Sequence, residues 1–246
     1  MISGRSFYEM CDWNLCNRYP LNFDPNLVKN GDFVFLNLDN YWQFPNLWNG
    51  KNVKINLITH NSDLTFTDEI NNLLSPFCHN IYSINSISSN NKIPLGFSDR
   101  LVPVISSILR ENISKNNLIY LNFKIQHATE RKECFDFFMG KNWVYVEFDV
   151  PETQFYEQIK MSKYTLCPIG TGLDTHRFYE SIYFNTIPIV KRNGLSDFHS
   201  KFPCIIVDNW SEINEEYLIN NYESNFNKLL DWKKNNDWLN PKFWIK

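Results

Sequence analysis

The sequence has no long apolar run and no strong net charge. Its 246 residues carry a formal charge of −3 at pH 7. Because the first residues contain no apolar stretch and no later run reaches the length of a bilayer, we expect neither a signal peptide nor a transmembrane segment. The nearly balanced charge gives no electrostatic reason to expect nucleic acid as a partner. These absences predict a soluble, cytoplasmic, globular protein.

The six cysteines form no CxxC pair, and their spacing is not typical of a metal site. Two of them, Cys167 and Cys204, lie in short apolar runs, where a free thiol behaves as a small hydrophobic side chain. We therefore expect free cytoplasmic thiols and no disulfide framework.

Residues 164–190 are the most informative stretch, and their pattern is that of a strand, a loop, a helix and a second strand. The first apolar run ends at Pro168, and the second occupies residues 187–190. In the loop, Gly170 and Gly172 allow a tight turn or a close approach of the backbone to a ligand. The loop ends in Asp174 and Thr175. Either residue is a suitable N-cap for a helix that continues to about residue 184.

His176 and Arg177 fall in the first turn of this helix, where unpaired N–H groups and the positive dipole end favour an anion. The Arg177 guanidinium can hold two phosphate oxygens at once. Glu180 lies three residues later on the same face, so a diphosphate followed by a ribose fits the spacing. The alternative is an ordinary surface ion pair between Arg177 and Glu180, which is common at this separation.

Two familiar nucleotide-binding motifs do not fit this loop. The dinucleotide motif needs a third glycine, but Leu173, Asp174 and Thr175 follow Gly172, and no acidic residue follows the next strand. The Gly-Lys-Ser/Thr ending of a phosphate-binding loop is also missing.

The pattern Cys167-Pro-x-Gly-x-Gly-x-Asp-x-His-Arg-Phe-x-Glu, followed by Ile187-Pro-Ile-Val, resembles the nucleotide-sugar-binding signature of exostosin-like glycosyltransferases, family 47. The similarity covers residues 118–213. It implies an α/β protein of GT-B fold, in which two Rossmann-like domains face each other across a cleft and the second holds the donor. It also implies that Arg177 contacts the donor diphosphate and that Glu180 contacts the ribose.

The rest of the chain is consistent with two α/β halves. Apolar runs alternate with helical patterns, as expected for Rossmann-like domains. A polar segment at 111–117 suggests a boundary between an acceptor-side domain, residues 1–115, and a nucleotide-sugar-binding domain, residues 116–246. The C-terminal tail is expected to cross back onto the first domain, as in other GT-B proteins. Strands are expected near 7–13 and at 32–39, 53–59, 80–84, 93–97, 118–123, 143–149, 164–167, 187–190 and 204–207.

Four further polar residues of the second half have alternative interpretations. The resemblance places Asn122 and Arg131 in a loop that contacts the donor phosphate, whereas the simpler interpretation is a turn residue and a solvated charge. Glu147 and Asp149 are expected on one face of a strand and come closest to the Asp-x-Asp metal motif of the other major fold, GT-A. Since the motif is incomplete, we predict no metal and no cofactor besides the nucleotide-sugar donor.

The catalytic base is expected in the first half, because the second half is occupied by the donor. His60 and Asp63 follow the clearest strand there, at the end where α/β sheets bind ligands. Asp63 is the first choice, His60 the second and Asp39 the third, and the alternative for Asp63 is a turn-capping role. The aromatic residues of 41–48 either pack in the core or form a platform for a sugar ring.

These features predict an inverting glycosyltransferase that moves a sugar from a nucleoside diphosphate donor, a UDP-sugar by resemblance, to a hydroxyl of a glycan. Two alternatives stay open, because one fold supports many functions. The first is a nucleotide-sugar epimerase of the same fold, and the second is a sugar-binding module without turnover.

Overall fold

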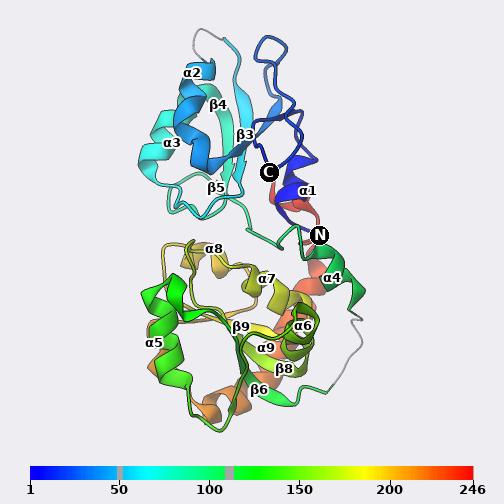
Figure 1. Cartoon of the computed structure of the whole chain (residues 1–246), viewed down its shortest axis with the longest axis vertical. Helices are drawn as coiled ribbons and strands as arrows, with labels where there is room; N and C mark the ends of the chain where they lie inside the picture. Colours follow the sequence, from blue (N-terminus) through cyan, green and yellow to red (C-terminus); the bar gives the residue numbers. More distant parts are fainter. Residues whose placement is uncertain (49–51, 109–113, 246) are drawn as a thin grey trace. The chain divides into compact units, whose positions relative to one another are not determined.

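The protein is an α/β protein that divides into two compact units (Figure 1). Its structure, a computed structural model, describes residues 1–48, 52–108 and 114–245. Unit 1 comprises Met1–Asp99 together with Trp238–Lys246, and unit 2 comprises Arg100–Asp237.

The division between the units falls after Asp99, earlier than the position expected from the sequence, which was residue 115. Helix α4 (Val102–Ser107) explains the difference, because it packs against α6 (Glu152–Met161) of unit 2. The polar segment at 111–117 follows a helix that already belongs to unit 2, and residues 109–113 lie outside the described residues. Polar composition alone therefore placed the boundary too late.

Unit 1 contains a parallel sheet of five strands in the order β1-β2-β3-β4-β5. Strands β2 and β3 are buried over nearly their whole length, as is typical of parallel strands covered on both faces. Because the spatial order follows the chain order, the strand order never reverses in this sheet. The strands are β1 (Trp13–Asn14), β2 (Phe33–Asn37), β3 (Ile55–His60), β4 (Cys78–Ser83) and β5 (Asn91–Lys92).

Short helices cover the first sheet. Phe44 and Trp48 stack with ring centroids 5.2 Å apart and belong to the same buried core as Leu57. Trp238 lies 6.2 Å from the ring centroid of Phe97, so the C-terminal segment packs within unit 1. The helices are α1 (Gly4–Tyr8), η1 (Leu38–Gln43), α2 (Phe44–Trp48), α3 (Asp68–Leu74), η2 (Ser75–Phe77) and η5 (Pro241–Trp244).

Unit 2 contains a second parallel sheet of five strands, in the order β10-β9-β8-β6-β7. The strands are β6 (Asn117–Leu121), β7 (Val144–Val146), β8 (Ser162–Leu166), β9 (Ile187–Lys191) and β10 (Ile205–Val207). The chain leaves β6 toward β7 on one side and leaves β8 toward β9 on the other. The strand order therefore reverses between β6 and β8.

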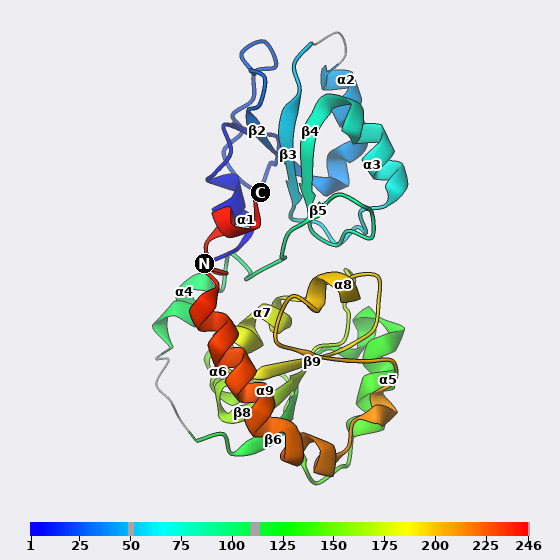
Figure 2. The same cartoon turned by 180° about the vertical axis from the view of Figure 1, so that it is seen from behind.

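The helices of unit 2 include the longest of the described elements, α9 (Glu215–Asn235). Figure 2 shows α9 across the second sheet, and it contacts β9. The remaining elements are α4, η3 (Ile125–His127), α5 (Thr129–Phe138), α6, α7 (His176–Tyr183), α8 (Ser196–His199) and η4 (Trp210–Glu212).

Two parallel five-stranded sheets in separate units are compatible with the expected pair of Rossmann-like domains. All six cysteines are free, as the sequence indicated. Among the described residues, no helix has the length and apolar composition required to cross a membrane. The same residues contain no group of three or more His, Cys, Asp or Glu side chains arranged to hold a metal ion.

Candidate active site

The residues expected to bind the donor gather where the strand order of the second sheet reverses. Strands β6 and β8 are direct neighbours there. The loop after β6 begins at Asn122, and residues 167–175 connect β8 to α7. In open parallel sheets, the carboxyl ends of two strands whose connections diverge form the usual ligand site. The topology therefore makes the carboxyl ends of β6 and β8 the candidate ligand site of unit 2.

Arg177 lies in the first turn of α7, and its guanidinium lies near two aromatic rings. The Cζ atom is 5.7 Å from the ring centroid of Phe123 and 5.3 Å from that of Phe155. Such contacts hold a cation by attraction to the ring quadrupole. The Nε atom is buried and has no hydrogen-bond partner in the part of the chain that the structure describes. Since a buried, unsatisfied donor costs free energy, this Nε atom is a candidate donor to an anionic group.

The guanidinium of Arg131, near the start of α5, lies against the same ring. Its Cζ atom is 6.0 Å from the centroid of Phe123. Its Nε donates to the carbonyl of Ile169 at 2.9 Å, and its Nη1 donates to the carbonyl of Lys124 at 3.1 Å. Burial, followed by the positive charge of Arg177, lowers the pKa of Arg131 to about 10. Two adjacent cations suit an anion with more than one charge, such as a diphosphate.

The glycine loop leaves room for Arg131. A Cβ atom at Gly170 would lie 2.7 Å from Nη2 of Arg131, which is closer than side chains pack. The N–H of Gly170 donates to the carbonyl of Gly172 at 3.1 Å and closes a tight turn. The N–H of Ile169 donates to the carboxylate of Glu130 at 3.1 Å. The loop is thus tied to the start of α5 by two consecutive side chains.

Glu180 is almost fully buried, with 4% of its surface exposed. Its Oε1 accepts a hydrogen bond from the hydroxyl of Tyr156 at 3.0 Å. Burial raises the pKa of Glu180, while the charges of His176 and Arg177 and the Tyr156 hydrogen bond oppose this rise. The ion pairs of the described residues do not include one between Arg177 and Glu180. The surface ion pair considered from the sequence is therefore not formed.

Asp174 uses its carboxylate for contacts inside the protein. Oδ1 accepts the backbone N–H of Thr175 at 2.9 Å and lies 3.3 Å from Nε2 of His199. Oδ2 accepts the hydroxyl of Tyr179 at 2.5 Å. Thr175 is the N-cap of α7 by position, but its own side chain makes no capping hydrogen bond. Sequence reasoning missed His199, because it lies 25 residues away and shares no local pattern with the loop.

The polar residues near the ends of β6 and β7 form a separate chain of hydrogen bonds. Asn122 donates through Nδ2 to the hydroxyl of Tyr120 at 2.9 Å, and that hydroxyl donates to Glu147 at 3.3 Å. The expectation that Glu147 and Asp149 share one strand is wrong, because β7 ends at Val146 and Asp149 has a positive φ of 50°. Side-chain alternation ends with the strand, so it does not bring this acidic pair to one face.

The candidates for the catalytic base lie around the carboxyl end of β3. His60 is the last residue of that strand, is 1% exposed and accepts the N–H of Asn61 through Nδ1 at 2.8 Å. Asp63 is exposed in the following loop. Asp39, which follows β2, is also exposed and accepts the hydroxyl of Ser62 at 2.5 Å. Of the two residues preferred from the sequence, Asp63 is the one that an external substrate can reach.

A family model described as the RXYLT1 C-terminal domain matches residues 104–239, more than half of the 246-residue chain. The chain belongs to the RXYLT1 C-terminal domain family. This membership supports an exostosin-related glycosyltransferase family, although it does not single out family 47. No curated protein matches the chain.

The region shared with the RXYLT1 C-terminal domain family contains both arginines that lie over the Phe123 ring. Arg131, Arg177 and Glu180 all lie within residues 104–239. His60 and Asp63 precede this region, so the family match does not cover them.

Proposed function

We propose that this protein is a GT-B glycosyltransferase that moves a sugar, with inversion, from a nucleoside diphosphate donor to a hydroxyl group of a glycan. Unit 2 holds the donor, and the earlier resemblance favours a uridine nucleotide. One observation carries the proposal: the guanidinium groups of Arg131 and Arg177 both lie over the ring of Phe123, beside the reversal point of the second sheet. The family of the chain supports the same class of reaction.

The two arginines act on the leaving group. As the bond between the anomeric carbon and the diphosphate breaks, negative charge accumulates on the diphosphate oxygens. The unpartnered Nε of Arg177 and the start of α7 stabilise that charge with donors that are already in place. Arg131, held by two backbone carbonyls, adds a second positive charge without having to reorganise. No divalent cation is needed in this proposal.

The nucleoside is assigned to the next turn of α7. Glu180 is 4% exposed, so the side chains that cover it must move before it accepts hydrogen bonds from the ribose hydroxyls. The Tyr156 hydroxyl holds its carboxylate in place. His176 and Asn122 complete the lining of the donor site. Gly170, Gly172 and Thr175 contribute through the backbone of the loop, and Asp174 contributes by fixing that loop.

The acceptor hydroxyl attacks from the face of the sugar opposite the diphosphate, and a base removes its proton. Asp63 is our first candidate for this base, because it is exposed beyond the carboxyl end of β3. His60 is the second candidate, and its burial requires the loop to move before the imidazole can meet a substrate.

Incubation with a panel of nucleotide sugars, followed by analysis of the products, tests the proposal. We expect transfer or slow hydrolysis of one donor, and thermal stabilisation by the corresponding nucleoside diphosphate. An isomerised donor would instead assign an epimerase. If no nucleotide binds and no donor changes, the proposed function is wrong.

A further inference from the structure

The 3₁₀ segment η1, which follows β2 directly, has two distinct faces. Leu38 is completely buried, and Tyr41 packs against the core of unit 1. Side chains three residues apart lie above one another in a 3₁₀ helix. Asp39 and Trp42 therefore share the other face, where Trp42 has 60% of its surface exposed. The aromatic stretch noted in the sequence is thus divided between core residues and one outward-facing indole.

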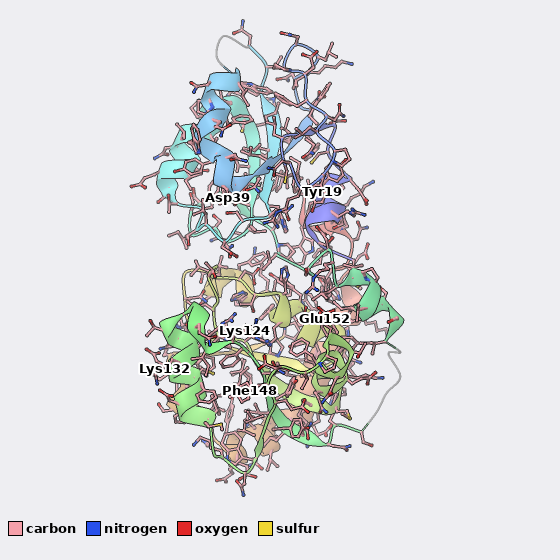
Figure 3. The ribbon with its side chains drawn as sticks, in the orientation of Figure 1. Tyr19, Asp39, Lys124, Lys132, Phe148 and Glu152 are labelled. Carbon is pink, nitrogen blue, oxygen red and sulfur yellow. The ribbon has the colours of Figure 1, made fainter. Side chains whose placement is uncertain are left out.

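The carboxylate of Asp39 is held in a defined position. The hydroxyl of Ser62, itself only 7% exposed, donates to Oδ1 at 2.5 Å. The backbone N–H of Asp39 donates to Oδ1 of Asn37 at 2.8 Å, which fixes the start of η1. No other hydrogen bond to this carboxylate occurs among the described residues, so Oδ2 is available to a ligand. Figure 3 labels Asp39.

Hydrogen bonds join the loops that follow β2, β3 and β4. Ser62 links the second of these loops to Asp39, and the side chain of Asn85 donates to the carbonyl of Ser62 at 3.2 Å. The N–H of Ile87 donates to the carbonyl of Phe66 at 3.0 Å. These contacts hold the three loops together at the carboxyl ends of their strands. The exposed surface that they support is formed by Asp39 and Trp42 of η1.

We propose that this surface binds the acceptor sugar, with Trp42 against the apolar face of a pyranose ring and Asp39 accepting a hydrogen bond from a ring hydroxyl. The inference rests on the proposed transferase function. A pyranose combines an apolar C–H face with hydroxyl donors around its rim. A flat, rigid indole beside a fixed carboxylate matches both features.

The charge of the surface identifies the class of acceptor. Residues 38–43 and 61–67 include the carboxylates of Asp39 and Asp63 and contain no lysine or arginine. A sugar that carries phosphate, sulfate or carboxylate groups would be repelled at this surface. The acceptor residue that meets Trp42 is therefore an uncharged sugar.

Binding to an array of neutral oligosaccharides, beside their sulfated and phosphorylated counterparts, tests this inference directly. We expect wild type to retain neutral glycans, Trp42→Ala to bind them roughly ten-fold more weakly and Trp42→Phe to lie between the two. Leu21→Ala, at an apolar position of unit 1 that is 68% exposed, is the matched control and should bind like wild type. Equal binding by Trp42→Ala, a preference for anionic glycans, or no binding by wild type would overturn the inference.

Nucleotide titration and acceptor kinetics separate this inference from the proposed function. Trp42→Ala and Asp39→Asn should raise the acceptor KM roughly ten-fold and leave the donor affinity unchanged. If the donor binds and the acceptor KM is unchanged in both variants, the inference is wrong and the proposed function stands. If wild type binds no nucleotide, the proposed function is wrong, and the glycan array still decides whether η1 binds a sugar.

Discussion

The Nε2 atom of His199 lies 3.3 Å from Oδ1 of Asp174, and this contact joins α8 to the loop that precedes α7. Both side chains are nearly inaccessible, with 2% and 5% of their surfaces exposed. Tyr179 donates to the same carboxylate from within α7. The arrangement makes Asp174 the centre of a buried network that sets the conformation of residues 167–175, the loop between β8 and α7.

Asp174→Asn is expected to destabilise the protein and loosen the donor loop together. The free energy of unfolding should fall by about 1–3 kcal/mol, because the buried side chains of Tyr179 and His199 lose their charged hydrogen-bond acceptor. Denaturant unfolding and nucleotide titration on the same variant measure both effects. Tyr179→Phe removes one hydrogen-bond donor and leaves the Asp174 carboxylate in place, so it should lower the free energy of unfolding by less. Normal stability combined with lost donor binding would show that Asp174 contacts the donor directly.

Arg177→Ala is expected to abolish turnover and to weaken nucleoside diphosphate binding by roughly 10- to 100-fold. This range corresponds to the loss of one hydrogen bond to a charged group, about 1.5–3 kcal/mol. The fold should persist, because the Nε atom has no hydrogen-bond partner among the described residues. Arg177→Lys keeps the charge but lacks the planar fork, so it should be intermediate. Calorimetric titration measures all three proteins, and wild-type affinity in Arg177→Ala would remove this residue from the site.

Glu180 should make stability depend on pH, with a sign set by its raised pKa. Between the ordinary glutamate value of 4.5 and the raised value, the folded state binds more protons than the unfolded state. The contribution of Glu180 to stability is therefore lost as pH rises through this window. Glu180→Gln should remove this pH-dependent loss of stability. The measurement is the difference between the unfolding free energies of wild type and Glu180→Gln at a series of pH values. A constant difference between wild type and variant would contradict the raised pKa.

We predict that transfer activity survives EDTA, because Arg131, Arg177 and the start of α7 supply the charge that a divalent ion supplies in GT-A enzymes. The measurement compares initial rates before and after dialysis against EDTA. Complete loss of activity, restored by manganese or magnesium, would contradict this prediction. Glu147 and Asp149 would then become the first residues to replace.

Asp63→Asn should lower the turnover number by roughly 10²–10⁴ and leave the donor affinity nearly unchanged, because the amide keeps the shape and loses the basicity. Asp39→Asn is the informative comparison, since its main effect is expected on the acceptor KM. Turnover of Asp63→Asn within a few-fold of wild type would exclude Asp63 as the base. His60 would be tested next, with folding monitored in parallel because the residue is buried.

The sequence determined the features that depend on neighbouring residues. Strands such as β3 and β9 were evident from their apolar runs. Helix α7 was evident from the two N-cap candidates that precede it, Asp174 and Thr175. The spacing of Arg177 and Glu180 on that helix left an anion site and a surface ion pair as alternatives, and the family resemblance favoured the anion site. Strands β1 and β5 were misplaced, because two residues are too few to show an alternating pattern. The strand expected near 7–13 is wrong, since Gly4–Tyr8 form α1, and β5 precedes the run 93–97.

Only the tertiary structure decided which residues meet across the sheet. Arg177 lies beside Phe123 because β6 and β8 are neighbours, and no local pattern reveals strand order. The same holds for His199 beside Asp174 and for α4, whose packing against α6 moved the boundary between the units. Local propensity acts over a few residues, whereas these contacts depend on how separate elements bury their apolar faces together. For that reason the sequence alone predicted a donor motif at residues 167–180, whereas the burial of His60 and the exposure of Trp42 depend on the tertiary structure.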